Sequence, residues 1–482
     1  MKKNTFVDFG LQAEILKSIA LLNFKYPTNV QTMLIETMLN FQDAVVQSQT
    51  GSGKTAAYAI PICQMLDWNE NKPQALILAP TRELAMQIRE DVFNIGRFKR
   101  IKVVVLIGQT PFSYQKKQLT QKMHVVVGTP GRVMDHIQRG TLDLSQLQFL
   151  IIDEADEMLN LGFMPQLDEI VKTLKKDRQT VLLSATMPER LEVLIGDYCH
   201  QAHIITIEEE DKVSNRIEQY VYEVTSHTKF QALKDVLTLE NPDSCIIFAN
   251  QKITVDDIVS ELTKLHYPVF KLHGGLEQDE RTEIINDFKS GAFRYLVATD
   301  VAARGLDIES VSLIINFDTP LEGEAYTHRI GRTGRFDQSG KAITLLTSNQ
   351  GKYLKNIEAY IGLKLLPYAK PTVDQLLAAK PEFTSKKSTL PKSKGHKTAA
   401  LNQGISSIQI KAGKQDKLRT VDIVGALCGL NQIESDDIGV IHIGDFLTDV
   451  EILNNKGKTV VDQLQTVSIK GKIRKVFIKP VK

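Results

Sequence analysis

The chain has 482 residues, 42% of them hydrophobic and 24% charged, with a formal net charge of +2 at pH 7. This length predicts a globular, soluble protein of about three domains, and the near-neutral charge means that any nucleic-acid surface has to be local. No stretch approaches the roughly 20 apolar residues of a membrane span, which excludes an integral membrane protein. The four cysteines form no CxxC pair, which excludes a disulfide or zinc scaffold. Together these features predict a cytoplasmic protein.

Short apolar runs alternate with helical patterns over residues 1–208. The runs include "DAVVQS" (43–48), "ALILAP" (75–80), "KVVVLIG" (102–108) and "TVLLSAT" (180–186). Runs of this kind, rich in Val, Ile and Leu, predict an α/β domain with a doubly wound parallel sheet. The acidic stretch "EEEDKVSN" (208–215) is typical of a linker, and the same pattern resumes over 209–366, which predicts a second domain of similar plan.

The last quarter of the chain changes in composition twice. Residues 367–404 are expected to be a basic flexible linker, because positions 380–404 carry six lysines against one glutamate together with Pro, Ser and Gly. Residues 405–482 return to ordered patterning in the order βαββαβ, which predicts a small α+β domain.

The stretch "SQTGSGKT" (48–55) lies between an apolar strand and a predicted helix. A phosphate-binding loop needs this context, because small residues let backbone N–H groups surround phosphates while the lysine reaches the β and γ phosphates. The generic pattern begins with Gly where this chain has Ser48, and a plain glycine turn is the alternative. The predicted nucleotide ligands here are Ser48, Gln49, Thr50, Gly51, Ser52, Gly53, Lys54 and Thr55.

Four acids follow the apolar strand in "FLIIDEADEML" (149–159): Asp153, Glu154, Asp156 and Glu157. Two carboxylates about 4 Å apart repel by roughly 4 kcal/mol at an effective dielectric constant near 20, so they need a counter-charge or separate roles. One interpretation is a bound metal ion, and the other is an acidic helix N-cap. With the phosphate loop about 100 residues upstream, Asp153 and Thr55 are predicted to hold Mg²⁺ and Glu154 to polarise the attacking water, while the cap stays open for Glu157.

The order of motifs over residues 1–366 resembles that of the DEAD-box RNA helicases. Beyond the two motifs above, the matching segments are "YPTNVQ", "APTRELA", "TPGR", "SAT" (184–186), "IIFAN", "VATDVAARGLDI" and "HRIGRTGR" (328–335). The resemblance implies two RecA-like P-loop domains that close on ATP and RNA, with ATP hydrolysed in the cleft and Mg²⁺ as cofactor.

The resemblance also assigns nucleotide-site roles outside the phosphate loop. It implies that Gln31 reads adenine with Phe24 stacking nearby, and that Asp307 faces the ribose. Ser184 and Thr186 would couple hydrolysis to domain closure, or form an ordinary strand-end turn. Arg332 and Arg335 would act as arginine fingers and His328 would bridge towards the acids; a plain cationic helix face is the alternative, which Gly331 and Gly334 disfavour.

RNA-backbone contacts are implied on both domains, although several of these segments are also ordinary turn sequences. The double glycine of the family is here Gly108–Gln109, which leaves that contact in doubt. Such contacts position RNA without specifying its sequence. The residues implied are Pro80, Thr81, Arg82, Gly108, Thr129, Pro130, Gly131 and Arg132 in the first domain and Gly274, Gln278, Arg281, Thr299 and Asp300 in the second.

Sequence specificity is therefore expected from residues 405–482. The βαββαβ order suggests an RNA-recognition-motif (RRM) fold, but "SIQIKAG" and "TDVEIL" lack the base-stacking aromatics, so the usual sheet face is not the expected reader. Lys470, Lys472, Arg474 and Lys475 are the candidate RNA contacts, with a solvated strand face as the alternative.

The basic linker and a tail with "DDIGVIHIGDF" and "VEILNNKGK" resemble the bacterial DbpA subgroup, including its Bacillus-type member. The resemblance implies a monomeric ATP-dependent helicase that unwinds short RNA duplexes on pre-50S particles, tethered to a 23S rRNA hairpin in the peptidyl-transferase region during large-subunit assembly. Two alternatives stay open: an ATP-gated RNA clamp that does not unwind, and a DNA helicase.

Overall fold

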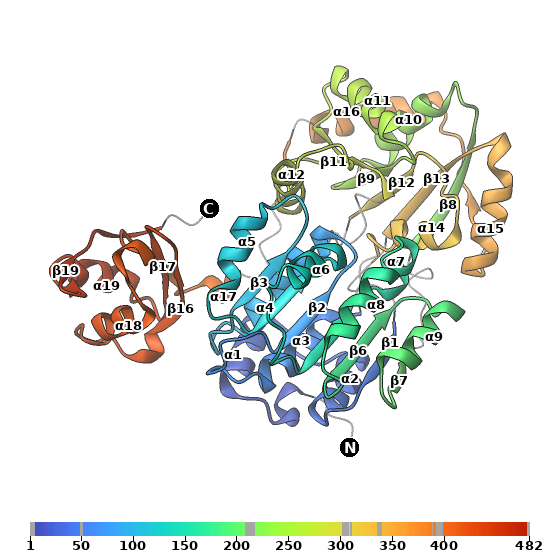
Figure 1. Cartoon of the computed structure of the whole chain (residues 1–482). Coiled ribbons are helices and arrows are strands. Elements are labelled where there is room, and N and C mark those ends of the chain that lie inside the picture. Colours follow the sequence, from blue (N-terminus) through green and yellow to red (C-terminus); the bar gives the residue numbers. More distant parts are fainter. Residues whose placement is uncertain are drawn as a thin grey trace. The chain divides into compact units, whose positions relative to one another are not determined.

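A computed structural model gives the fold of the chain, and its first domain is built on a seven-stranded parallel sheet (Figure 1). The residues that the structure describes are 5–48, 52–207, 217–300, 308, 311–334, 340–387, 389–391 and 399–479. Across the sheet the strands run β3 (Val103–Leu106), β4 (Val125–Gly128), β2 (Ala75–Leu78), β5 (Phe149–Ile152), β6 (Gln179–Ser184), β1 (Ala44–Gln47) and β7 (His203–Thr206).

Helices cover both faces of this sheet because the strand residues alternate between two hydrophobic clusters. In β5, Phe149 and Ile151 join one cluster while Leu150 and Ile152 join the other. The first face is covered by α1 (Ala13–Leu21), α2 (Asn29–Leu39), α3 (Lys54–Met65) and α4 (Arg82–Ile95). The second is covered by α6 (Pro130–Gln138), α7 (Ala155–Asn160), α8 (Met164–Thr173) and α9 (Glu189–Tyr198), and α5 (Phe112–Leu119) follows β3.

The second domain repeats this plan on another seven-stranded parallel sheet. Its strands run β10 (Val269–Leu272), β11 (Tyr295–Ala298), β9 (Cys245–Phe248), β12 (Leu313–Asn316), β13 (Gly340–Thr347), β8 (Ile217–Val224) and β14 (Leu366–Pro367). Helices α10 (Lys229–Glu240), α11 (Lys252–Lys264) and α16 (Val373–Lys387) pack on one face, and α12 (Gln278–Ser290), α14 (Gly323–Ile330) and α15 (Gly351–Ile361) on the other. The two parallel sheets confirm the predicted pair of RecA-like domains.

Part of the segment expected to be a flexible linker is ordered, because α16 belongs to the second domain. Phe383 is 5% exposed, and its ring centroid lies 5.7 Å from that of Tyr267. Arg294, itself buried, donates from Nη2 to the carbonyl oxygens of Lys386 and Thr389 at the end of the helix. Lysine content alone suggested a solvated tether, whereas one aromatic side chain and one capping arginine hold this helix in place.

The C-terminal domain is a four-stranded antiparallel sheet with two helices on one face. The strand order is β16 (Ile438–Ile443), β17 (Thr448–Ile452), β15 (Ser406–Ile410) and β20 (Val476–Ile478), with α18 (Thr420–Cys428) and α19 (Gly457–Leu464) contributing to its core. A hairpin of β18 (Ser468–Ile469) and β19 (Lys472–Ile473) precedes β20, and the short α17 (Ala399–Asn402) precedes the domain. The expected α+β fold is confirmed. Among the described residues, no helix is both long and apolar enough to cross a membrane.

Candidate functional site

Apart from Phe24 and Gln31, which precede the first strand, the predicted site residues of the first domain follow the carboxyl ends of its parallel strands. The strand order places β5, β6 and β1 side by side, and these strands lead into the acids, the "SAT" segment and the phosphate loop. The neighbouring strands β3, β4 and β2 lead into the loops with Gly108, Thr129 and Pro80. Ligands of open α/β sheets bind at this edge, so one half of the sheet presents the nucleotide candidates and the other half the RNA candidates.

The phosphate loop leads directly into α3. Its N-cap, Gly53, has φ 86°, a left-handed conformation that favours glycine. The Lys54 ammonium is buried and donates to the Ser48 carbonyl oxygen at 2.6 Å, and Ser48 Oγ donates to Ser52 Oγ at 2.8 Å. The Lys54 side chain is thus held against the phosphate loop, at the place where phosphates would bind. The predicted ligands Gln49, Thr50 and Gly51 lie outside the described residues.

The predicted adenine reader, Gln31, is tied to the phosphate loop. Its Nε2 donates to the Gly53 carbonyl oxygen at 3.2 Å, and its Oε1 accepts from the Thr28 backbone N–H at 2.9 Å. A Cβ atom at position 53 would lie 2.6 Å from Gln31 Nε2, so glycine is also required there for this close approach. Phe24 is 36% exposed, with its ring centroid 6.5 Å from that of Phe6, so its ring is accessible for stacking.

The first acid, Asp153, is buried at the end of β5 and contacts the helix that follows the phosphate loop. Tyr58 Oη donates to Asp153 Oδ2 at 2.9 Å, and the Glu154 backbone N–H donates to Oδ1 at 3.0 Å. Burial raises the pKa of Asp153, while the charge of Lys54 opposes that rise. A buried carboxylate needs a cation, and carboxylate and hydroxyl oxygens are ligands of the kind that Mg²⁺ prefers. Asp153 at the end of β5 and Thr55 in the first turn of α3 therefore stay the candidate Mg²⁺ ligands. The sequence analysis did not single out Tyr58, which joins the phosphate-loop helix to this acid.

A second acid, Asp156, joins the acidic segment to the "SAT" segment. Its Oδ2 accepts from the backbone N–H groups of Ala185 and Thr186 at 3.0 and 2.8 Å, and from Thr186 Oγ1 at 3.0 Å. The sequence analysis gave Asp156 no role, because nothing local links residues 30 positions apart. Ser184 Oγ donates to the Thr186 carbonyl oxygen at 2.5 Å, so the expected strand-end turn is present as well.

The helix-cap interpretation of the acidic cluster describes part of its geometry, and the metal-ion interpretation stays a prediction. Helix α7 starts at Ala155 with Asp156 and Glu157 in its first turn, where the helix dipole favours negative charge. Glu154 precedes it at φ 51°, a left-handed conformation that is uncommon for a non-glycine residue. Glu154 is thus the N-cap residue of α7, and Asp153 precedes it at the strand end.

On the RNA half of the first domain, two arginines lie against the loop after β3. A Cβ atom on Gly108 would lie 3.1 Å from Arg82 Nη2, so Gly108 provides the space for that guanidinium. Arg132 Nη1 donates to the Thr110 carbonyl oxygen at 2.8 Å. Thr81 caps α4 through its hydroxyl, and α6 follows Thr129 with Pro130 and Gly131 in its first turn. The structure therefore brings the eight predicted residues of this domain onto three adjacent loops and the first turns of the helices α4 and α6.

In the second domain, Arg329 and Asp300 form a buried ion pair. Arg329 Nε and Nη2 contact Asp300 Oδ1 and Oδ2 at 2.5 and 2.7 Å, and the arginine is 1% exposed. Both carboxylate oxygens of this RNA candidate are therefore engaged by Arg329. Helix α14 ends at Ile330, so His328 is helical, and the buried Arg332 follows the helix end.

The remaining candidates of the second domain lie at its strand ends, in helix α12 or outside the described residues. Gly274 follows β10, Thr299 follows β11, and Arg281 is buried in α12, which begins at Gln278. Asp307 and Arg335 lie outside the described residues, and the side chain of Gln278 is not described.

The basic residues of the C-terminal domain divide into paired and exposed cations. Arg474 Nη1 lies 2.8 Å from Asp416 Oδ1, and Lys470 Nζ lies 3.3 Å from Asp422 Oδ2. Lys472 and Lys475 are exposed. The four candidates therefore differ in how accessible their charge is. Among the described residues, no ion pair is recorded for Lys472 or Lys475, so their charges remain at the surface.

The face of the C-terminal sheet opposite its two helices is polar. Gln409 Nε2 donates to Asp449 Oδ1 at 2.8 Å, and their neighbours Ile408 and Val450 point into the core instead. Phe477 pairs with Gln409 across the strands and is 36% exposed, an aromatic ring that the sequence analysis did not identify. This single ring, on a face that also carries Asp449, offers less stacking surface for bases than the two or three aromatics of a typical RRM.

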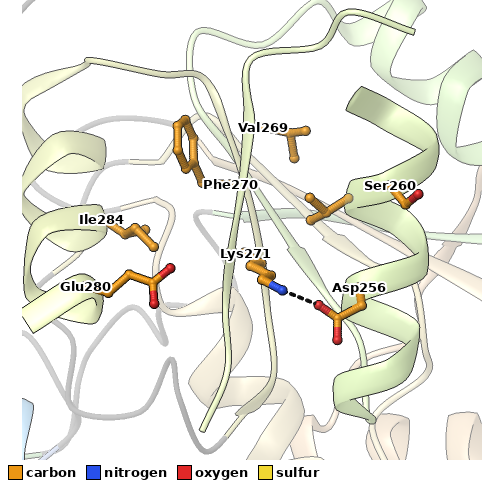
Figure 2. A pocket seen from close by; sticks show the side chains of 8 residues that line it. Asp256, Ser260, Val269, Phe270, Lys271, Glu280 and Ile284 are labelled. Atoms are coloured by element: carbon orange, nitrogen blue, oxygen red, sulfur yellow. Dashed lines mark hydrogen bonds and ion pairs between the residues drawn. The ribbon is translucent and has the colours of Figure 1, made fainter. Parts of the chain in front are cut away.

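A hollow of about 360 Å³ lies at the edge strand β10 of the second domain (Figure 2). Helices α11 and α12 flank it, and Lys271 Nζ pairs with Asp256 Oδ1 at 2.6 Å on one side. The predicted site residues do not line it. We assign no role to this hollow.

Comparison with known proteins gives the same three-part division. Residues 28–194 match the family described as DEAD/DEAH box helicase, 228–337 the helicase conserved C-terminal domain, and 407–478 the DbpA RNA binding domain. The chain is 48% identical over 471 residues to the ATP-dependent RNA helicase DbpA of Bacillus subtilis, covering 98% of each chain. It is 37% identical to the B. subtilis DEAD-box helicase CshA, covering 79% of this chain and 77% of that one.

A solved structure of S. cerevisiae Dbp5 bound to RNA and ADP BeF3 is also similar. It is 31% identical, with a TM-score of 0.70, over 80% of this chain and 100% of Dbp5. From these matches and the three domains, the chain belongs to the DEAD-box ATP-dependent RNA helicases of the DbpA type, RNA-dependent ATPases with an RNA-binding C-terminal domain.

Proposed function

We propose that this helicase locally separates short RNA duplexes and is directed to 23S rRNA during large-subunit assembly. The observation that carries the proposal is the strand order, which groups the predicted nucleotide residues of one sheet edge after β1, β5 and β6 and the predicted RNA residues after β2, β3 and β4. A domain matching the DbpA RNA binding domain follows in the same chain and supports a dedicated targeting surface.

On the nucleotide half, Lys54 would bind the β and γ phosphates and Gln31 the adenine, with Phe24 stacking on the base. Asp153 and Thr55 would hold Mg²⁺, which when bound supplies charge neutralisation at the β and γ phosphate oxygens. Glu154 would accept a proton from the attacking water and so act as the general base. In the second domain Arg332 and Arg335 would stabilise the transferred phosphoryl group, with His328 bridging towards the acids and Asp307 facing the ribose.

On the RNA half, Arg82 and Arg132 would contact phosphates together with the backbone of the loops at Pro80, Gly108 and Thr129. Thr299, Gly274, Gln278 and Arg281 would extend this track on the second domain. The ion pair with Arg329 supports a positioning role for Asp300, because its carboxylate would repel a phosphate unless it were neutralised. Contacts to phosphates are independent of sequence, so the two domains alone would not select an RNA.

Selection would come from the C-terminal domain acting as a tether. A tethered module raises the effective concentration of the core on nearby duplexes, typically to about millimolar, without any new contact in the core. Lys472 and Lys475 are the favoured RNA contacts, because both are exposed, while Arg474 and Lys470 are paired with acids. The target would be the hairpin of the peptidyl-transferase region, on pre-50S particles.

The test compares ATPase rates of the full chain with a 23S rRNA hairpin fragment and with an unrelated RNA of equal length. Salt is held fixed, because phosphate binding is strongly salt-dependent. Half-saturation at a far lower concentration of the ribosomal fragment is expected, and deletion of residues 405–482 should remove this preference while saturating generic RNA still elicits ATPase. Equal curves for the two RNAs would refute the targeting. A strand-displacement assay that shows ATPase without unwinding would replace the unwinding proposal with an RNA clamp.

A further inference from the structure

A buried glutamine in α5 lies beneath the RNA half of the first domain. Gln115 is 0% exposed and belongs to none of the motifs quoted from the sequence. Its Nε2 donates to the Ile107 carbonyl oxygen at 2.8 Å, and its Oε1 accepts from Arg132 Nη1 at 2.8 Å. One amide therefore joins the loop after β3 to an arginine of α6, two segments of the proposed RNA surface.

The orientation of this amide follows from its partners. A carbonyl oxygen accepts and a guanidinium donates, so the Gln115 amide nitrogen has to face Ile107 and its oxygen has to face Arg132. His136 Nε2 lies 3.1 Å from the same Oε1, which means that this ring nitrogen carries a proton and donates. Each atom of the amide thus has a complementary partner, so a flipped amide would place donors against donors.

A neutral histidine, His136, helps to hold the Gln115 amide in this orientation. His136 is buried, Nδ1 lies 2.8 Å from Thr141 Oγ1, and the ring stacks on Phe112 with centroids 4.1 Å apart. Burial, with the charge of Arg132 adding to it, lowers the pKa of His136 to about 4. The imidazole is therefore neutral near pH 7, with one N–H available for Gln115.

The loop held by Gln115 contains the departure from the family's double glycine. Gln109 has φ 63°, a conformation that costs a non-glycine residue about 1 kcal/mol or more. The carbonyl oxygens on either side of it are both engaged: Ile107 O by Gln115 and Thr110 O by Arg132 Nη1, at 2.8 Å each. Arg132 uses Nη1 for its bonds to Thr110 and Gln115, and its Nε lies 3.9 Å from Asp135 Oδ2. The side chain is 18% exposed, so Nη2 is the part of the guanidinium that remains for a ligand.

We propose that Gln115 is a positioning residue for RNA binding, which fixes both the Arg132 guanidinium and the 107–110 loop in the geometry that meets the RNA backbone. This inference rests on the proposed function of Arg132 as a phosphate contact. Gln115 itself is buried and does not touch RNA. Its removal should therefore change RNA binding and leave the nucleotide half of the sheet edge intact.

The experiment uses the full chain with Gln115→Met, a substitution that keeps the length of the side chain and removes its donor and acceptor. Gln118→Met is the matched control, because Gln118 lies one turn further along α5, is only partly buried, and donates to Tyr114 Oη of the same helix. With poly(U) as the RNA, Gln115→Met should raise the half-saturating concentration for ATPase about tenfold, while kcat at saturation and the affinity for a fluorescent ATP analogue without RNA stay within about twofold. Gln118→Met should behave as wild type.

The salt dependence of poly(U) binding provides a readout that a merely structural role would not change. Loss of one phosphate contact lowers the slope of log K against log salt by about one. Gln115→Met should lower this slope as Arg132→Ala does. If Arg132→Ala leaves the slope and affinity unchanged, the proposed function of Arg132 fails. If Arg132→Ala weakens binding and Gln115→Met does not, the positioning role of Gln115 is refuted while the contact stands.

A second pair of variants applies if Gln115→Met does not fold, as judged by loss of ATP-analogue binding. His136→Gln can still donate to Gln115 Oε1, whereas the shorter His136→Asn cannot. Weaker poly(U) binding by His136→Asn than by His136→Gln supports the positioning role, and equal binding by the two variants overturns it.

Discussion

Arg329 in α14 connects four segments of the second domain, and its substitution by lysine should destabilise that domain selectively. The guanidinium has five N–H groups. Two contact Asp300, and the other three donate to the Asp318 carbonyl oxygen at 2.7 Å, Asn250 Oδ1 at 2.7 Å and Asn316 Oδ1 at 3.2 Å. These partners follow or end strands β9, β11 and β12, so one side chain holds three adjacent strand ends to the helix that leads to Arg332.

The magnitude follows from counting donors. Lysine keeps the charge but has three N–H groups, so at least two of the five bonds are lost, at about 1.5 kcal/mol or more each for a charged group. Arg329→Lys should therefore cost about 3 kcal/mol, which for a domain of this size lowers its Tm by roughly 6–12 °C. Arg329→Met also leaves the Asp300 carboxylate without its partner and should cost about 3–5 kcal/mol, part of which Asp300→Leu should restore in the double variant.

The assay exploits the single tryptophan, Trp68, which lies in the first domain. Calorimetry follows all unfolding transitions, whereas Trp68 fluorescence follows the first domain and serves as the internal control. Arg329→Lys should lower one calorimetric transition and leave the fluorescence transition in place. If neither transition moves, the five-bond network does not stabilise the domain. If both move equally, the assumption that the domains unfold separately is wrong.

Three further predictions concern the first domain. Glu154→Gln should retain the affinity for a fluorescent ATP analogue and lower the ATPase kcat by about 10² or more, and an unchanged kcat would remove Glu154 from the chemistry. Asp156→Ala removes the acceptor of three hydrogen bonds to Ala185 and Thr186, so it should cost about 3–5 kcal/mol and lower the Trp68 transition, which Asp156→Asn should lower less. Mainly because of burial, the pKa values of His124 and His136 are lowered to about 4, against about 6.5 in the unfolded chain. Between these values the unfolded state binds more protons than the folded state, so stability falls as the pH drops from about 6.5 to about 4. Urea titrations at several pH values should show this loss, with a smaller loss in His136→Gln; a midpoint independent of pH would contradict the neutral, buried state of both rings.

The sequence predicts most of the fold because its signals are local. Apolar runs such as "DAVVQS" and "ALILAP" are buried on both faces, and parallel strands of this kind show their burial directly in their composition. The phosphate loop and the acids each follow such a run, so their place at the carboxyl edge also follows from the sequence. The helix α16 could not be predicted from the sequence, because its lysines and Pro381 obscure the single buried contact of Phe383.

The supporting contacts of the site are not predictable in this way, because they join positions far apart in the chain. Tyr58 and Asp153 are 95 positions apart and Asp156 and Thr186 are 30 apart, and neither pair forms a periodic pattern. Gln115 and Arg132 are separated by a strand and two turns. Tyrosine, aspartate and glutamine are also common at surfaces, so only the folded sheet shows that these particular side chains are buried and paired.

The adjacency of β2 and β5 provides a short physical route between the two halves of the sheet edge. Leu78 pairs with Ile152, and the Asp153 backbone N–H donates to the Leu78 carbonyl oxygen at 3.0 Å. Asp153 therefore lies one strand spacing, about 4.8 Å, from the backbone that leads through Pro80 to Thr81 and Arg82. Two sites that share a pair of buried, hydrogen-bonded strands cannot move independently, because close-packed interiors transmit displacement instead of absorbing it. If Mg²⁺ and ATP bind beside Asp153 and RNA binds at Arg82, as proposed, both would affect the same two strand ends, and this shared strand pair would couple the ATPase to RNA.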